Sequence, residues 1–234
     1  RMLVFGGDAG SPDAQTWALS LGATPSWSLV VPSGTPPLAR YGHSAVRDPL
    51  RERMIVFGGA AAARFDDVWS LSLPGPPVWS RLQPSGTPPA ARENHCAIYD
   101  PVRDRMIVFG GSAGEGLDDV WALDLAGYPT WSRIVAAGAG PGTRTRHAAV
   151  YDPVRDRMLV FGGQGVDRST GDLWALSLSG TPTWTQVLAE TPGSGPEPRS
   201  GHTLTYDPAR DRRWLVGGFG PVGNDVWTLA LAGG

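Results

Sequence analysis

A seven-residue stretch recurs along the chain at a nearly constant interval, and this repeat limits the fold more than any other feature. It reads Arg-Met-Ile-Val-Phe-Gly-Gly at 53–59 and 105–111, and the copies at 1–7 and 157–163 differ only by Leu for Ile. A divergent fifth copy, Arg-Arg-Trp-Leu-Val-Gly-Gly, lies at 212–218. Successive copies begin 52, 52, 52 and 55 residues apart. A period of this length indicates one supersecondary unit repeated, rather than one irregular globule.

Each period is predicted to hold four short β-strands, which we call a, b, c and d. In the second unit we expect them at 43–47, 53–57, 68–73 and 78–82. The apolar runs are short, rich in β-branched and aromatic residues, and separated by Gly and Pro, which argues against helices. Strand b ends at the double glycine, where the missing Cβ permits a sharp turn or a close approach of backbones.

Two tryptophans recur with the glycines, the first in strand c and the second in strand d. Short strands at regular spacing, with Gly and Trp once per unit, are typical of β-propeller blades. The double glycine, the Asp-Val-Trp-x-Leu of strand c and the second Trp together resemble the kelch repeat over the whole chain. The resemblance implies an all-β fold, a β-propeller of about five four-stranded blades, and says little about function. The tryptophans are Trp17, Trp69, Trp121, Trp174 and Trp227 in strand c, and Trp27, Trp79, Trp131 and Trp184 in strand d.

We predict a single domain whose repeat units span roughly 1–37, 38–89, 90–141, 142–196 and 197–234. The first unit then lacks an inner strand a, and the last lacks an outer strand d. Two arrangements remain open: a nearly closed five-bladed ring, or part of a six- or seven-bladed parent. An open array would leave bare strand edges, which favour aggregation.

Composition excludes several classes of function. The net charge is −2, and all 20 basic residues are Arg, so no concentrated basic face for nucleic acid is indicated. The single cysteine, Cys96, excludes an internal disulfide and a cysteine-rich metal site. No apolar run approaches the 18 residues of a membrane span, so we expect no membrane partner.

The connections between strands divide into two faces. Because strands alternate in direction, the a–b and c–d loops lie on a lower face, and the b–c and d–a connections lie on an upper face. The lower a–b loops at 100–104 and 152–156 are both Asp-Pro-Val-Arg-Asp, which suits a scaffold. Variable loops on a rigid frame form binding surfaces, so the upper face is the candidate site. Its b–c loops differ in every unit, at 8–14, 60–65, 112–117, 164–170 and 219–223.

An Arg-x-x-His motif precedes each strand a. Propeller symmetry would bring these residues together at the upper mouth of the central channel, where guanidinium groups suit carboxylates or phosphates. In kelch propellers that capture acidic peptides, arginines in Arg-x-Gly settings face the pocket, and two of the four arginines here match that setting. The matching arginines are followed two residues later by Gly42 and Gly201. In the other two units, Asn94 and Arg146 stand at the position of this glycine. The motif residues are Arg40, Arg92, Arg144 and Arg199, with His43, His95, His147 and His202.

A structural interpretation competes with ligand binding at these positions. A residue found in every blade can serve the repeat itself, and a buried arginine would have to pair with loop carbonyls or with the Asp of Asp-Val-Trp. For the histidines, a metal would need three or four ring nitrogens within about 2.1 Å of one point. No carboxylate recurs beside them, so we expect hydrogen-bonded histidines and no metal. The counterparts of Cys96 are Ser44, Ala148 and Thr203, which indicates a small packing position.

We therefore expect a non-catalytic, monomeric binding module without a cofactor, which holds a protein segment, including an acidic one, or another anionic ligand. The predicted contacts are the four motif arginines together with Tyr41, Glu93 and Arg146, which differ between units. One alternative is a metal-dependent kelch-type enzyme, an oxidase or a specifier-like protein. The chain has no Tyr/Cys/His set suited to copper and no Glu-x3-Asp-x3-His stretch. The other alternative is a structural or designed scaffold without a ligand, against which the differing upper loops argue.

Overall fold

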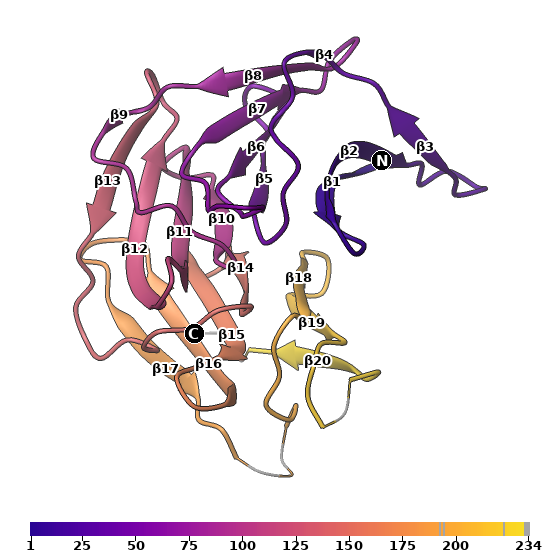
Figure 1. Ribbon diagram of the computed structural model, residues 1–234. Helices are drawn as coiled ribbons and strands as arrows, with labels where there is room; N and C mark the ends of the chain where they lie inside the picture. The colour runs from indigo at the N-terminus through magenta and orange to yellow at the C-terminus, as the bar shows by residue number, and fades with distance from the viewer. Residues whose placement is uncertain (192, 194, 222, 232–234) are drawn as a thin grey trace.

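Five small sheets surround a central axis (Figure 1). The computed structural model describes residues 1–191, 193, 195–221 and 223–231, so parts of the predicted fourth and fifth units and of the loop at 219–223 lie outside the described residues. The described residues form β-strands and no helix. This confirms the predicted all-β, five-bladed propeller. No described residue belongs to a helix that could cross a bilayer.

Each sheet forms one blade, and the strands follow chain order from the axis outward. Blade 1 contains β1 (Met2–Asp8), β2 (Pro12–Leu19) and β3 (Trp27–Val30). Blade 2 contains β5 (Ser44–Asp48), β6 (Arg53–Phe57), β7 (Val68–Ser72) and β8 (Val78–Leu82). Blade 3 contains β10 (Cys96–Asp100), β11 (Arg105–Ser112), β12 (Gly116–Asp124) and β13 (Thr130–Ile134). Blade 4 contains β14 (Ala148–Asp152), β15 (Arg157–Gln164), β16 (Ser169–Ser177) and β17 (Trp184–Leu188), and blade 5 contains β18 (Thr203–Asp207), β19 (Arg212–Val216) and β20 (Val226–Ala230).

Two very short strands were not predicted. β4 (Ser33–Gly34) and β9 (Ser85–Gly86) belong to the linkers between blades, and they pair in parallel with β8 and β13 at the outer edge of the next blade. Gly34 adopts a φ of +80°, and a Cβ there would lie 2.4 Å from the carbonyl oxygen of Trp79. Only glycine allows this approach, so the linker can cover an outer strand edge that would otherwise be bare.

The hydrophobic core lies between blades rather than within one. On β6, Ile55 and Phe57 face blade 3, where they pack with Met106 and Val108 of β11. Met54 and Val56 face the opposite way and pack with Phe5 of blade 1. Because side chains alternate along a strand, a sheet covered on both faces needs apolar residues at every position. This explains the uninterrupted apolar run in strand b.

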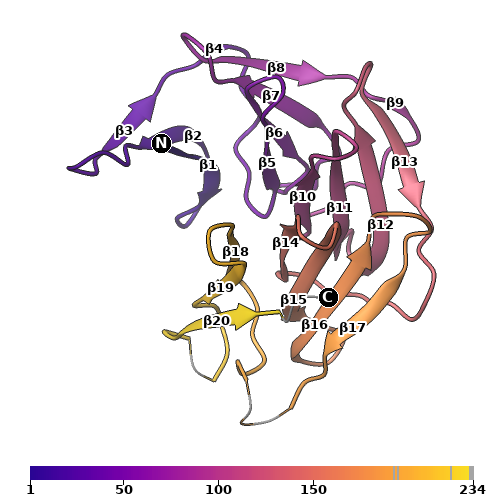
Figure 2. The ribbon, with the colours of Figure 1, turned by 180° about the vertical axis from the view of Figure 1, so that it is seen from behind.

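The first and last blades stand at the two ends of the ring and leave apolar side chains uncovered. Figures 1 and 2 show the indigo N-terminal sheet and the yellow C-terminal sheet at these ends. Trp27 of blade 1 is 53% exposed, whereas its counterpart Trp79 is 3% exposed. Val216 of blade 5 is 43% exposed, whereas its counterpart Phe57 is fully buried. The end faces therefore lack the cover that each inner blade receives from its neighbours.

Candidate functional site

The upper face is held together by the backbone of the motif arginines. Arg40 donates its amide hydrogen to the carbonyl of Asp13 at the start of β2, where the b–c loop of blade 1 ends, at 2.9 Å. Its own carbonyl accepts from the amide of Gly7, also at 2.9 Å. A side chain at Gly6 would meet that same carbonyl at 2.7 Å, which explains the requirement for glycine at the end of strand b. The linker before each blade is thus bonded to the loop of the preceding blade.

The side chain of each motif arginine binds its own blade. Arg40 is fully buried and donates to the carbonyl of Gly58 at 2.8 Å and to both carboxylate oxygens of Asp67 at 2.6 and 3.0 Å. Backbone and side chain together therefore join two consecutive blades. We call the set the arginine clasp: Arg40, Arg92, Arg144 and Arg199, paired with Asp67, Asp119, Asp172 and Asp225.

The clasp confirms that the motif arginines serve the repeat, as the structural interpretation proposed. The carboxylate of Asp67 accepts from the guanidinium of Arg40 and, at 2.7 Å, from the indole of Trp69. Burial opposes ionisation of Asp67, but the hydrogen bonds from Arg40 and Trp69 outweigh it and hold the pKa of the carboxyl below its ordinary value. Direct ligand contact by the clasp arginines stays a prediction.

Two residues after each clasp arginine, four left-handed residues form a hydrogen-bonded arc, which we call the mouth ring: Gly42, Asn94, Arg146 and Gly201, with φ of 62°, 55°, 53° and 66°. Asn94 donates its amide to Gly42 at 2.7 Å, Arg146 donates to Asn94 at 2.8 Å, and Gly201 donates to Arg146 at 2.7 Å. These bonds link the entrances of strands β5, β10, β14 and β18, the four inner strands. The left-handed conformation explains why glycine occurs at two of the positions.

The remaining predicted contacts lie on this same face. Arg146 is exposed, and its guanidinium has no partner among the described residues. Glu93 forms an ion pair with Arg64 of the blade 2 loop at 3.0 Å and accepts from the side-chain Nδ2 of Asn94 at 3.3 Å. Tyr41 is half-buried beside that loop and pairs through its backbone with Ala60. The pairing of Arg64 with Glu93 was not predicted from the sequence. Arg64 lies in a loop that differs in every unit, so no equivalent residue in another unit indicates where its side chain points.

The four motif histidines are packed into the blade interfaces. The ring of His147 lies edge-on to Phe109, with centroids 5.0 Å apart, and His95 shares a hydrogen bond of 2.8 Å with the hydroxyl of Ser44. Burial and the nearby Arg144 lower the pKa of His147 to about 3, so the ring is neutral at pH 7. Within the described residues, no three His, Cys, Asp or Glu side chains gather as a metal site would require. Burial also raises the pKa of the Cys96 thiol.

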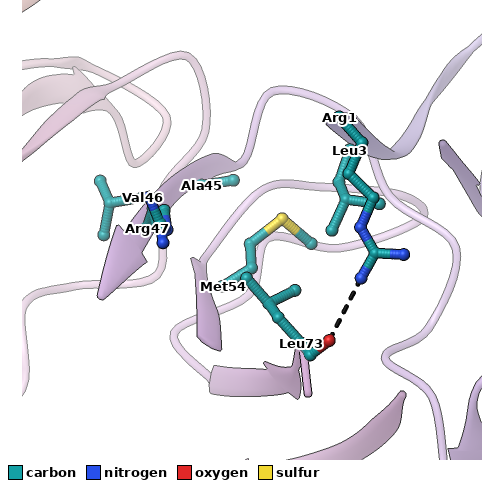
Figure 3. Close-up of a pocket in the computed structure, with 7 residues that line it drawn as sticks. All are labelled: Arg1, Leu3, Ala45, Val46, Arg47, Met54 and Leu73. Atoms are coloured by element: carbon teal, nitrogen blue, oxygen red, sulfur yellow. Dashed lines mark hydrogen bonds between the residues drawn. The ribbon is translucent and has the colours of Figure 1, made fainter. Parts of the chain in front are cut away.

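One cavity lies away from the upper-face candidates. It has a volume of about 460 Å³ and lies between blades 1 and 2, with Leu3 and Arg1 on one side and Val46 and Met54 on the other (Figure 3). Arg1 donates to the carbonyl of Leu73 at 3.1 Å across it. Within the part of the chain that the structure describes, β1 pairs only with β2, whereas strand b of blades 2 to 5 also pairs with an inner strand. A smaller cavity of about 250 Å³ opens on the upper face between blades 3 and 4, beside Thr145.

Comparisons with known proteins agree with this architecture. A family model described as the KLHDC2/KLHL20/DRC7 Kelch-repeats domain matches residues 1–128 and again residues 76–233. The chain is 30% identical over 220 residues to the leucine-zipper-like transcriptional regulator 1 homolog of Drosophila melanogaster, covering 88% of this chain and 22% of that protein. It is 31% identical over 242 residues to host cell factor 2 of Homo sapiens, covering 86% of this chain and 30% of that protein. The chain thus spans less than a third of the length of these relatives.

Proposed function

Because the chain belongs to the kelch-repeat β-propeller family, we propose that it is a non-catalytic binding module whose upper face and channel mouth hold an acidic segment of another protein. Kelch relatives carry many functions, so the proposal rests on the site rather than on the fold. The observation that carries it is the mouth ring and, within it, Arg146. The other upper-face residues are assigned to the proposed binding site by their position around the Arg146 side chain.

Arg146 combines an unfavourable backbone with an unpaired charge. A non-glycine residue in the left-handed region costs about 1–2 kcal/mol, and its counterparts Gly42 and Gly201 avoid that cost. Backbone strain of this kind concentrates at functional positions. The exposed guanidinium offers a planar, bidentate donor that matches a carboxylate. An acidic side chain is therefore the group that we assign to the mouth.

Tyr41 and Glu93 are proposed to border the bound segment on the blade 2 and blade 3 sides. Tyr41 can offer a ring face and a hydroxyl. Glu93 is held by Arg64, so it would discriminate against segments that place a second carboxylate there. We include Arg40, Arg92, Arg144 and Arg199 as the frame of the site, because direct contact would require a ligand carboxylate to displace an aspartate from each clasp.

Arg146→Ala tests this function. The protein is screened against a library of acidic peptides, and the tightest peptides are measured by isothermal titration. We expect the variant to bind them at least tenfold more weakly, because it loses the charge-assisted hydrogen bonds. The control is Arg210→Ala, which removes a 67% exposed arginine from the lower face. Equal loss in both variants, or no selected peptide whose binding depends on Arg146, would refute the proposal.

A further inference from the structure

The Nε atom of the clasp arginine has the same partner in three of the four clasps. It donates to the carbonyl two residues upstream, at 3.0 Å in Arg40, 3.1 Å in Arg92 and 3.0 Å in Arg199. In the clasp of blade 4, the Nε of Arg144 has no hydrogen-bond partner among the described residues, although this side chain is only 3% exposed. Buried polar groups are normally hydrogen-bonded, so this donor stands out from its three counterparts.

The linker before blade 4 explains the difference. The residue two positions before Arg144 is Gly142, with a φ of +75°, in the left-handed region that favours glycine. The guanidinium donates through Nη2 to the carbonyl of Pro141 instead, which leaves Nε without an acceptor. The other linkers carry Leu38, Ala90 and Glu197 at the position of Gly142, and none of these has a positive φ.

A cavity opens beside this arginine on the upper face, and we call it the threonine cavity. Its volume of about 250 Å³ equals that of several water molecules, at roughly 30 Å³ each. Blades 3 and 4, which border it, each contain strands a to d and lie side by side (Figure 1). The lining includes Gly116, Thr143, Arg144, Thr145, Gln164 and Val166.

Two hydroxyl groups line the cavity without a partner. Neither Thr143 nor Thr145 forms a side-chain hydrogen bond to a described residue. The backbone of Thr145 exchanges hydrogen bonds of 2.9 and 2.7 Å with that of Gln164, so this wall of the cavity is held in place. The hydroxyl of Thr143 is specific to this linker, since its counterparts are Ala39, Ala91 and Pro198.

The charge around the cavity indicates the chemistry of the ligand. Nε can only donate, so it needs an acceptor, whereas a hydroxyl both donates and accepts. The charge of Arg144 is already matched by Asp172, at 3.0 Å, and a carboxylate ligand would bring a second negative charge close to that aspartate. A primary carboxamide is neutral. Its oxygen can accept from Nε, and its NH₂ group can donate to a threonine hydroxyl.

We propose that the threonine cavity binds a primary carboxamide, the group that ends the side chains of glutamine and asparagine. This group reaches Nε without displacing Asp172 from the clasp. The cavity lies beside the mouth ring, but its three unpartnered groups belong to Arg144, Thr143 and Thr145, so the inference does not rest on the proposed function. The acidic-peptide screen with Arg146→Ala tests that function separately.

A pair of capped amino acids tests the choice of ligand. The ¹⁵N-labelled protein is titrated with N-acetyl-glutamine N-methylamide and with the matched glutamate compound, and amide shifts are followed by NMR. We expect saturable shifts at residues 143, 145 and 164, and at least tenfold weaker binding of the glutamate compound there. Propionamide carries the same group without a peptide backbone. Weaker binding of propionamide supports a ligand that is a peptide segment, and equal binding supports a free amide.

Matched variants of the linkers locate the site. Thr143→Val keeps the shape of the side chain and removes its hydroxyl, so the glutamine compound should bind at least tenfold more weakly. Thr143→Ser keeps the hydroxyl and should bind normally, which shows that loss of binding is not a loss of folding. Thr87→Val removes an exposed hydroxyl from the linker before blade 3 and should change nothing. No saturable shift, equal binding of the glutamate compound at these residues, or full binding by Thr143→Val overturns the proposal.

Discussion

The upper and lower faces both carry repeated arginine–aspartate pairs, but the two sets differ in environment. The clasp arginines are 0–3% exposed, and each pairs with an aspartate of its own blade. The lower belt, as we call the other set, consists of Arg51, Arg103 and Arg155, which reach Asp104, Asp156 and Asp211 of the next blade. These arginines are 15–33% exposed. The same two residue types therefore act in a dry interface above and in a partly wet one below.

The lower belt explains why its loops are nearly identical. Asp100 is fully buried and accepts from the amides of Val102 and Arg103 and from the side chain of Arg105. Arg103 then spans to Asp156, which also accepts from the hydroxyl of Tyr151. The two aspartates and the arginine of the loop each bind through their side chains, so variation at these three positions is limited. On the upper face the clasp does the joining, and the loop tips are free to vary.

The largest expected difference between the faces is in stability. Asp119→Ala removes the partner of the buried Arg92 and should lower the free energy of unfolding by about 3–5 kcal/mol, because a buried charge is left unpaired. Arg103→Ala breaks the corresponding ion pair of the lower belt. It should lower the free energy of unfolding by only about 1 kcal/mol, since water screens a partly exposed pair. Urea denaturation followed by tryptophan fluorescence measures both. Equal losses would remove the distinction between a dry and a wet set.

A matched control separates charge from packing in the clasp. The double variant Arg92→Met with Asp119→Leu removes both charges and keeps much of the volume. It should regain most of the stability lost in Asp119→Ala, because no unpaired charge remains. Stability as low as in the single variant would show that the hydrogen bonds to loop carbonyls, rather than the ion pair, hold the blades.

As the pH falls, protonation should reduce the stability contributed by the upper face before that contributed by the lower face. The pKa of His147 is about 3 in the folded protein against 6.5 ordinarily, so the unfolded chain binds this proton first as the pH falls. Its contribution to stability is complete above pH 6.5 and declines towards the folded pKa, by about 2 kcal/mol at pH 5. His147→Gln should flatten the fall in stability between pH 7 and 5 by that amount. A carboxylate of the lower belt, Asp104, has its pKa lowered by Arg51 and does not titrate in this window.

The pH experiment has its own control on the lower face. Asp104→Asn removes a carboxylate of the lower belt and should leave the slope of stability between pH 7 and 5 unchanged. The two slopes are compared by urea denaturation at each pH. If His147→Gln retained the full wild-type slope of stability against pH, the acid sensitivity would have to arise from groups other than the imidazole of His147.

The smallest expected effect is a gain in stability at the mouth ring. Arg146→Gly should relieve the left-handed strain of about 1–2 kcal/mol, less the entropy that glycine loses on folding, for a net gain of about 0.5 kcal/mol. Asn94→Gly should gain less, because asparagine tolerates this conformation better. Both are measured by thermal and urea unfolding. A loss of stability in Arg146→Gly would show that its side chain serves the fold rather than a ligand.

Much of the fold could be predicted because each strand depends on local signals that the repeat presents several times. The strand predicted at 53–57 is β6, and the one at 78–82 is β8. The linker strands β4 and β9 could not be predicted in this way. Each has only two residues, and each pairs with a strand more than 40 residues further along the chain. Their existence depends on how consecutive blades approach one another.

The number of repeat units, the strand order and the positions where only glycine or a small residue fits could be read from the sequence alone, because these follow from local backbone geometry and a repeated pattern. Only the tertiary structure decided which charges are paired. Arg40 and Arg146 are both arginines before a strand a, but one meets Asp67, 27 residues away, and the other meets no partner among the described residues. A guanidinium takes whatever acceptor the assembled loops bring within reach, and that distance is set by the packing of the blades.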